Sequence, residues 1–536
     1  MSEYDYVIVG AGSAGCILAT RLAQSGAEVL LVEAGASDRT RFCDIPGMVS
    51  VIHTVPEVKK RFDWGFYTVP QKHALDRRIP AVRGKVLGGS SSINGMLFVR
   101  GNRSNYDDWA RDGCPGWSFD DVLPAFKRME DWEGGAGDYR GQGGPIAVTK
   151  KNNLTPASTA FIEAVMETFS VPLTDDYNAG EQEGAMVFQQ SARGGRRFSS
   201  SLALRKPEPR LGVRTGVLVE RLVMQGSHVR GVSLRVGRER EIVHARREVV
   251  LCAGVFGSPQ LLMLSGIGPA EHLRGLGIDV VADLPVGDNL HDHMFMPLTF
   301  LAPSAKHRGT LGHFLGGMLT EAVRGNSWFG GTVFEGGAFV RSKHAENGVP
   351  DLQIHMLPWA YPSPNQDKPV RPVVDMRPAM TLMPTLIYPK SRGTVRLASA
   401  DPEASPLIDP AYLSDPRDRQ FLFDGVKLMR DVAASARLRE VVTGELHPAD
   451  AARDDDALRR ELPNRATTVY HPVGTCRMGS DERAVVDPLL RVRGIEGLRV
   501  ADAAIMPSIT GGNTNAPAMM IGQRCAELML ANQSVA

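Results

Sequence analysis

The amino-acid sequence predicts an α/β protein that opens with a Rossmann-like βαβ unit. Three observations support this: a glycine fingerprint lies between two apolar runs in the first forty residues, a further apolar run ends in glycine at 249–254, and another ends in an acid at 498–502. Apolar residues form 43% of the 536-residue chain and charged residues 23%, an ordinary globular mix. At about 100–200 residues per domain, this length allows about three or four domains at most.

The first strand, at residues 4–9, runs directly into the motif Gly-Ala-Gly-Ser-Ala-Gly at 10–15. Apolar residues at helical spacing follow as far as Gly26, and a second apolar strand at 28–32 ends at Glu33. This order of strand, G-x-G-x-x-G, helix, strand and acid is typical of adenine dinucleotide binding. The alternative is a glycine turn without a ligand, which the two strands and the spacing of the acid disfavour.

Each residue of this fingerprint has a physical role. Gly10 allows the tight turn, Gly12 lets the backbone approach a pyrophosphate, and Gly15 lets the helix pack closely on the strand. The helix N-terminus offers free N–H groups to phosphates. The carboxylate of Glu33 can accept hydrogen bonds from both ribose hydroxyls and repels a 2′-phosphate, which disfavours NADP. The fingerprint alone leaves FAD and NAD open.

Charge and cysteine usage exclude several functional classes. The net charge of +1 provides no basic field for a nucleic acid. The six cysteines are scattered without a C-x-x-C pair, which fits a reduced, cytoplasmic environment and argues against a disulfide framework or a cysteine zinc site. We expect no signal peptide, because the first residues lack a basic region and enter a strand at once. No apolar run reaches the roughly 18 residues of a membrane-spanning helix.

Later segments continue the pattern in chain order. A long Gly/Ser loop at 83–96 lacks the G-K-[ST] ending of a P-loop, and its small residues would let the main chain lie against a flat ring or a pyrophosphate. A capped helix with a glycine stop is expected at 258–268. Residues 470–479 read Tyr-His-Pro-Val-Gly-Thr-Cys-Arg-Met-Gly, and 512–517 lead into a helix that runs to about residue 530.

Together these motifs resemble the glucose–methanol–choline (GMC) oxidoreductase family. The loop from Gly84 to Asn94 continues through Gly101 and Asp107 in the spacing of the family's first signature, and 258–268 resembles its second. The segments at 470–479 and 512–517 look like its two catalytic segments. The resemblance spans residues 4 to about 530 and is greatest toward the bacterial alcohol, choline and sorbose dehydrogenases.

The resemblance implies a discontinuous, two-domain layout. A Rossmann-like FAD-binding domain would comprise 1–155, 195–300 and 460–536. An α+β substrate-binding domain, an antiparallel sheet flanked by helices, would comprise 156–194 and 301–459.

The resemblance also implies FAD, bound in an extended form with its adenine end at Glu33. Ile93 stands where some members carry the histidine that links FAD covalently, so we expect FAD to be held without a covalent bond. Asp502 resembles the family acid that hydrogen-bonds the FAD chain. The residues expected to bind the cofactor are Gly10, Gly12, Ser13, Ala14, Gly15, Glu33, Ala34, Trp64, Val86, Gly89, Ser90, Asn94, Gly95, Met96, Leu97, Val219, Ala253, Asp502, Ala503, Asn515, Ala516 and Pro517.

The chemistry that the resemblance implies is oxidation of a primary alcohol to an aldehyde, with hydride transfer from the α-carbon to flavin N5. His471 is the catalytic base by position, and imidazole titrates near neutrality. Asn515 is expected at the second catalytic position, where its amide can stabilise the alkoxide without titrating. The N-terminus of the helix starting near Pro517 is expected to face the flavin pyrimidine ring and to favour the negative charge that develops there.

Substrate identity is left open by the sequence. Glu335 matches a glutamate of choline dehydrogenases, so a choline-type cation is one alternative. Trp359 and Tyr361, with Val469 and Tyr470, are expected to line the pocket and would suit a neutral, aromatic or medium-chain alcohol. The electron acceptor is either oxygen or a quinone or dye, and an oligomer is possible. A non-redox lyase or a light-driven decarboxylase of the same family is the second alternative.

Three other patterns receive structural interpretations. The His-Asp-His run at 291–293 has a spacing that would also suit a metal, but it resembles the family's Asn-Leu-x-Asp-His segment, so we expect no metal site. Arg193, Arg196 and Arg197 are expected to form a structural loop. Residues 302–330 and 358–373 are expected to be loops or a lid.

Overall fold

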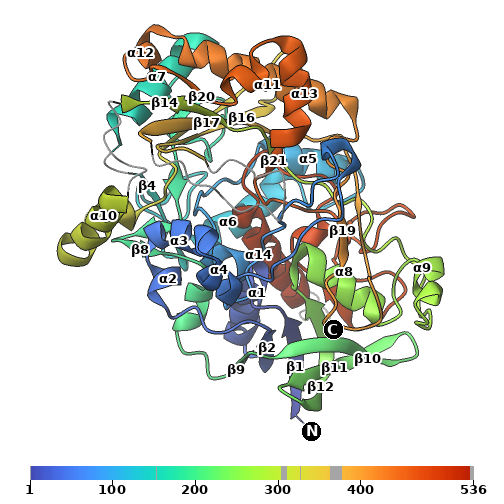
Figure 1. The fold of residues 1–536 in the computed structure, drawn as a ribbon. Helices are drawn as coiled ribbons and strands as arrows, with labels where there is room; N and C mark the ends of the chain where they lie inside the picture. Colours follow the sequence, from blue (N-terminus) through green and yellow to red (C-terminus); the bar gives the residue numbers. More distant parts are fainter. Residues whose placement is uncertain (1, 152–153, 304–310, 326, 362–376, 532–536) are drawn as a thin grey trace.

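The computed structural model describes residues 2–151, 154–303, 311–325, 327–361 and 377–531. Two sheets organise the chain, one at the bottom and one at the top of the molecule in the view of Figure 1. Each sheet carries its own apolar core. The α/β fold class that the sequence predicts is thereby confirmed.

The first sheet has seven strands in the order β10-β11-β12-β1-β2-β9, with β22 paired to β12. Its centre is parallel, because β1 pairs in parallel with β12 and β2, while β2 does so with β9 and β12 with β22. The carboxyl ends of these parallel strands therefore meet at one edge. The strands are β1 Ser2–Val9, β2 Val29–Glu33, β9 Leu211–Thr215, β10 Leu218–Gln225, β11 His228–Val236, β12 Glu239–Leu251 and β22 Leu498–Val500.

Two helices from opposite ends of the chain pack together against this sheet. They are α1, Ser13–Gln24, and α14, Asn515–Ala531. Their close approach needs glycine, because a Cβ on Gly522 would lie 2.3 Å from the carbonyl oxygen of Ala14. A Cβ on Gly15 would likewise lie 1.9 Å from the carbonyl oxygen of Gly10, so this glycine lets α1 lie against β1.

The second sheet has eight strands and is antiparallel in all its recorded pairings. Its order is β20-β14-β17-β16-β15-β5, with β13 paired to both β17 and β21. Helices α7, α11, α12 and α13 cover it at the top of Figure 1. The strands and helices are β5 Gly184–Val187, β13 Met294–Phe295, β14 Leu298–Leu301, β15 Gly336–Val340, β16 Leu352–Leu357, β17 Ala379–Leu386, β20 Gly444–His447, β21 Thr467–Thr468, α7 Pro156–Phe169, α11 Pro416–Ala433, α12 Ala436–Arg439 and α13 Asp455–Arg465.

The chain enters the second sheet at two places that matter for function. Strands β13 and β21 pair with each other there, although both fall in ranges expected for the first domain. The segments beside them, 291–293 and 469–473, are joined by backbone hydrogen bonds. Two histidine-bearing segments 180 residues apart are thus held side by side between the sheets.

The remaining elements connect and cover the sheets. They are α2 Arg41–Asp44, α3 Val49–Thr54, α4 Pro56–Phe62, α5 Arg103–Arg111, α6 Phe119–Met129, α8 Gly254–Leu264, α9 Ala270–Gly275, β3 Glu130–Trp132, β4 Ile146–Lys150, β6 Gln189–Gln190, β7 Ala192–Arg193, β8 Arg196–Arg197, β18 Thr394–Arg396 and β19 Leu407–Asp409. Within the described ranges, no helix combines the length and the apolar character that a membrane span requires.

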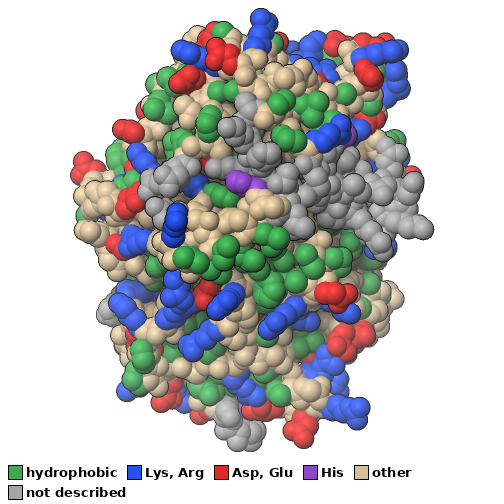
Figure 2. Space-filling view, turned by 60° about the vertical axis from the view of Figure 1, so that its left-hand side comes forward, with side chains coloured by type: hydrophobic (Ala, Val, Ile, Leu, Met, Phe, Trp, Pro, Cys, Tyr) green, Lys and Arg blue, Asp and Glu red, His purple; other side chains and the backbone are tan. Residues whose placement is uncertain are grey.

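The loop expected over 302–330 contains a helix, α10, at Leu311–Arg324. Phe314 packs on Phe329 with ring centroids 5.1 Å apart, which anchors one side of the helix. Leu319 and Val323 on another side are exposed, and Figure 2 shows hydrophobic side chains gathered on the face that carries α10. The glycines of this segment hid its helical periodicity. The other expected loop, 358–373, lies mostly outside the described residues.

Candidate active site

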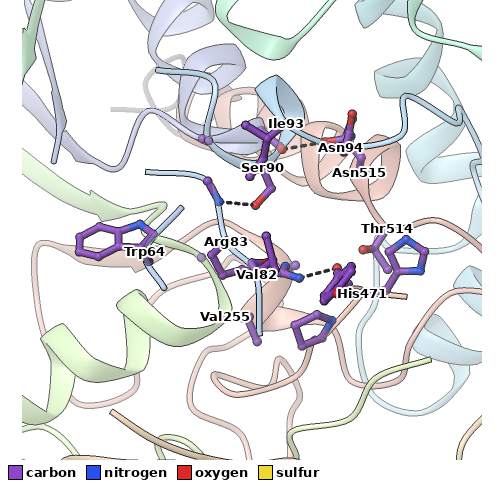
Figure 3. Close-up of a pocket in the computed structure, with 18 of the residues that line it drawn as sticks. Trp64, Val82, Arg83, Ser90, Ile93, Asn94, Val255, His471, Thr514 and Asn515 are labelled. Atoms are coloured by element: carbon purple, nitrogen blue, oxygen red, sulfur yellow. Dashed lines mark hydrogen bonds between the residues drawn. The ribbon is translucent and has the colours of Figure 1, made fainter. Parts of the chain in front are cut away.

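A cavity of about 520 Å³ extends from the glycine fingerprint to the segment around His471. Its walls come from both sheets, and its size is that of a site for a small molecule or cofactor. In Figure 3, His471 and Thr514 lie on one side of the pocket, Trp64 lies on the other, and Asn94 lies beside Asn515.

The fingerprint end is a glycine cradle. Gly10 has φ +98°, and a Cβ there would lie 2.4 Å from the carbonyl oxygen of Cys252. Gly89 has φ +55°, and its Cβ would lie 2.8 Å from the Cα of Gly12. Helix α1 begins directly after Gly12, which caps it without a side chain. The N-terminal N–H groups of α1 thus meet a surface of bare backbone, which fits a pyrophosphate.

Glu33 closes this end of the cavity. Its buried carboxylate accepts hydrogen bonds from the backbone N–H groups of Ala11 at 3.0 Å and Gly35 at 2.8 Å, one on each oxygen. Burial raises the pKa of Glu33 to about 7, against the lowering effect of those two bonds. Each oxygen keeps lone-pair capacity, so the arrangement fits a ribose diol.

Asp502 lies at the end of β22 and also lines the cavity. Its carboxylate accepts hydrogen bonds from Ser258 Oγ at 2.6 Å and from the N–H groups of Gly254 at 2.9 Å and Ala504 at 2.8 Å. Burial raises its pKa, and the three bonds oppose that shift. Asp502 therefore joins the strand end to the start of α8.

The Gly/Ser loop is tied down by one buried arginine. Arg197 donates to Asn94 Oδ1 at 2.7 Å and to the carbonyl oxygens of Asn94 and Cys43. Arg193 and Arg196, its neighbours on the β7–β8 hairpin, form ion pairs with Asp131 and Asp44. The three arginines are structural rather than a free basic patch.

Most residues expected to bind the cofactor line the cavity, and four do not. Gly15 serves the packing of α1 on β1. Val86 is buried in an apolar cluster that includes Phe62 and Ile93. Ala516 and Pro517 lie buried in the first turn of α14. The expected residues that do line the cavity are Gly10, Gly12, Ser13, Ala14, Glu33, Ala34, Trp64, Gly89, Ser90, Asn94, Gly95, Met96, Leu97, Val219, Ala253, Asp502, Ala503 and Asn515.

His471 follows β21 and reaches into the cavity between three polar partners. Its backbone N–H donates to Asp292 Oδ1 at 2.8 Å. Its ring Nδ1 lies 3.1 Å from Nδ1 of His293, and its Nε2 lies 3.2 Å from Nδ2 of Asn513. Burial lowers the pKa of His471 well below its usual range, and the neighbouring His293 adds to that shift. The imidazole is therefore neutral at neutral pH, as a proton acceptor must be.

The second amide beside the histidine is Asn513, not Asn515. Asn515 is the first residue of α14, and its Oδ1 accepts a hydrogen bond from Ser13 Oγ at 2.7 Å. That contact joins the N-termini of α1 and α14. The helix also begins at Asn515 rather than near Pro517, so Asn513 precedes it and can turn toward His471.

The wall beside His471 is apolar. Trp359, Tyr361, Val469 and Tyr470 line it, as expected from the sequence. The only acidic residues among the described lining residues are Glu33 and Asp502, both at the dinucleotide end. The sequence analysis missed five apolar residues of this wall, which are Phe295, Val333, Phe334, Leu357 and Met383.

Glu335 does not reach this pocket. It is 1% exposed, and its Oε2 accepts from the N–H of Thr155 at 2.9 Å, from Thr155 Oγ1 at 2.9 Å and from Ser158 Oγ at 2.6 Å. These residues form the start of α7, so the carboxylate anchors a helix N-terminus, which favours negative charge. The assignment of Glu335 to the substrate pocket is therefore corrected.

Cysteines and the His-Asp-His run have structural roles. All six cysteines are buried and free, and burial raises the pKa of Cys476 well above its usual value, which keeps it a thiol. Asp292 and His293 both contact His471, while His291 Nδ1 bonds to the carbonyl of Asn289 at 2.6 Å. Across the ranges given above, no three His, Cys, Asp or Glu side chains group as a metal site would require.

Comparison with known proteins gives a consistent family. Models described as GMC oxidoreductase match residues 4–295 and 389–522. A protein named oxygen-dependent choline dehydrogenase, from Rhizobium etli, is 39% identical over 548 residues, which cover 100% of this chain and 97% of the relative. An uncharacterized GMC-type oxidoreductase from Mycobacterium tuberculosis is 39% identical over 540 residues, covering 98% and 99%.

Solved structures share the whole fold. Pyridoxine 4-oxidase from Mesorbium loti superimposes with a TM-score of 0.87 at 30% identity, covering 98% of this chain and 99% of the other. A variant of formate oxidase from Aspergillus oryzae, solved to examine FAD modification, has a TM-score of 0.90 at 26% identity, covering 99% of each chain.

Proposed function

The chain belongs to the GMC oxidoreductase family, as its motifs predict, and on that premise we propose that it oxidises a primary alcohol to an aldehyde with His471 as the base. GMC oxidoreductases are FAD-binding flavoproteins that act on CH–OH donors. The observation that carries the proposal is the neutral imidazole of His471, which faces an apolar cavity continuous with the dinucleotide cradle. The expected division into FAD-binding and substrate-binding domains is part of this proposal.

The residues around the reacting oxygen have separate tasks. When bound, FAD supplies the hydride acceptor, flavin N5. His471 Nε2 accepts the hydroxyl proton, and the Nδ2–H of Asn513 donates to the developing alkoxide. Asp292 holds the backbone of His471 and, through its other oxygen, accepts from Tyr412 OH at 2.6 Å and Thr468 Oγ1 at 2.5 Å. Its charge is therefore engaged away from the substrate.

The apolar wall favours a neutral substrate. Phe295, Trp359 and Tyr361 offer aromatic surface for the alcohol's carbon chain or ring. The runner-up is a choline-type cation, favoured by the relative named oxygen-dependent choline dehydrogenase and by the ability of aromatic faces to hold a cation. The lack of a lining carboxylate near His471, within the described residues, makes the neutral alcohol our first choice. A lyase or decarboxylase would keep the flavin oxidised during turnover.

Non-covalent FAD is part of the same proposal. Ile93 lines the cavity where a linking histidine would stand, and it carries no nucleophile. His53 also lines the cavity, but its Nε2 is held by the carbonyl oxygen of Ile93 at 3.0 Å. Acid precipitation of the holoenzyme should therefore release all the yellow colour. A pellet that stays yellow after washing would contradict this point.

One titration tests the function. The holoenzyme is mixed anaerobically with choline, aliphatic and aromatic primary alcohols, and the flavin absorbance near 450 nm is followed. We expect bleaching by an apolar alcohol and weaker bleaching by choline. Re-admitting air and measuring peroxide then separates oxygen from a quinone or dye as acceptor. If no alcohol bleaches the flavin, the proposal is wrong and the non-redox alternatives take its place.

A further inference from the structure

We propose that His293 is a positioning residue that fixes the tautomer of His471, so that the basic lone pair of His471 points into the cavity. This inference rests on the proposed function. His293 lies between two fixed partners: its Nε2 is 3.0 Å from the carbonyl oxygen of Ile387, and its Nδ1 is 3.1 Å from Nδ1 of His471. It is fully buried and does not line the cavity, so it acts only through His471.

The proton positions follow from Ile387. A carbonyl oxygen only accepts hydrogen bonds, so Nε2 of His293 must carry a proton. Burial lowers the pKa of His293 to about 3, so the ring carries no second proton at neutral pH. Nδ1 of His293 is then a bare acceptor, and the Nδ1 of His471 facing it must be the donor.

The other nitrogen of His471 is thereby left unprotonated. A neutral imidazole has one donor and one acceptor, so with its proton on Nδ1 its lone pair is on Nε2. Asn513 agrees with this assignment, because its Nδ2 faces that lone pair at 3.2 Å while its Oδ1 accepts from Gln353 Nε2 at 3.1 Å. Donor and acceptor alternate without conflict from the Gln353 amide to the Ile387 carbonyl.

The same contact persists after proton transfer. When Nε2 of His471 takes the substrate proton, the ring becomes an imidazolium whose Nδ1–H still donates to His293. In the opposite tautomer the lone pair of His471 would face His293 instead of the cavity, and its Nε2–H would oppose the N–H of Asn513. A neutral histidine here does for orientation what a carboxylate does in other His-based sites, without adding a buried charge.

A matched pair of variants separates positioning from packing. The amide of asparagine sits two bonds from Cβ, where the Nδ1 of histidine sits, so His293→Asn keeps an acceptor for His471 and loses the bond to Ile387. The amide of glutamine sits three bonds from Cβ, like Nε2, so His293→Gln keeps the bond to Ile387 and loses the acceptor. Each variant removes one hydrogen bond and the ring, so a packing role predicts equal effects.

The readout is anaerobic stopped-flow flavin reduction by the best alcohol. We expect His293→Gln to lower the limiting reduction rate by about 10- to 100-fold, a part of what a general base contributes, with little change in substrate Kd. His293→Asn should stay within about threefold of the wild type. FAD content and Tm of each holoenzyme report on folding.

Equal rates in the two variants, or a slower His293→Asn, would overturn the inference, and so would unchanged rates in both. If His293→Gln does not fold, His293→Asn compared with His293→Ala gives the same contrast, because alanine lacks the acceptor. His471→Ala is measured alongside. If that variant reduces flavin as fast as the wild type, the proposed function fails. If only the His293 contrast is missing, the positioning role alone fails.

Discussion

FAD should bind this protein about 25-fold more weakly at pH 5.5 than at pH 8, because of Glu33. Burial raises the pKa of that carboxyl to about 7 in the cofactor-free protein. Two ribose hydroxyls that donate to it would favour its ionised form by at least about 3 kcal/mol, or about two pKa units. Binding below pH 7 must then release a proton, and the apparent Kd rises about tenfold per pH unit down to about pH 5.

The assay is quenching of FAD fluorescence as apoprotein is added, at constant ionic strength from pH 5.5 to 8. Glu33→Gln cannot titrate, so its Kd should be flat with pH and about 30- to 150-fold weaker at pH 8, since two hydrogen bonds lose their charge assistance. Glu28→Gln, an exposed position just before the same strand, is the control and should behave as wild type. A wild-type Kd that does not change with pH, or an unchanged slope in Glu33→Gln, would refute this reasoning.

Three further predictions concern the region around His471. Asn513→Ala should slow flavin reduction by about 10- to 100-fold through loss of one hydrogen bond to the developing alkoxide, whereas Asn515→Ala should chiefly lower FAD content; stopped-flow rates and flavin-to-protein ratios distinguish them, and the reverse pattern would restore Asn515 to the catalytic position. Cys476→Ser should keep most activity, because the buried thiol takes no part in hydride transfer; a thousandfold loss with flavin intact would contradict this. The wild-type rate of flavin reduction should form a plateau through neutrality and fall through one apparent pKa below 6.5, because burial lowers the pKa of His471 and only its neutral form accepts a proton; an inflection above pH 7 would argue against it.

Local spacing was enough to predict the first sheet's centre. The turn at Gly10, the helix after it and the acid at Glu33 depend on neighbours within about thirty residues, and each appears where the pattern placed it. The pairing of β13 with both β17 and β21 joins segments far apart in the chain. No periodicity within either segment carries that information, so the second sheet's register could not be predicted.

The errors in the site have the same origin. Asn513 and Asn515 are two residues apart, and only the observed start of α14 shows which of them turns toward His471. His293 was assessed only as a metal ligand, because its partner lies 178 residues away. Glu335 was assigned to a cation pocket because it is an acid, but its partners at the start of α7 are 177 and 180 residues away.

The most direct test of the account is anaerobic stopped-flow flavin reduction of wild type and His471→Ala across pH with the same alcohol. General-base help is typically about 10²–10⁴ in rate, so the variant should reduce flavin slower by about that factor while keeping its FAD. It should also lose the inflection of the wild-type pH profile, because no other group takes the hydroxyl proton. If His471→Ala keeps both the wild-type rate and the same inflection, His471 is not the base and the proposed mechanism is wrong.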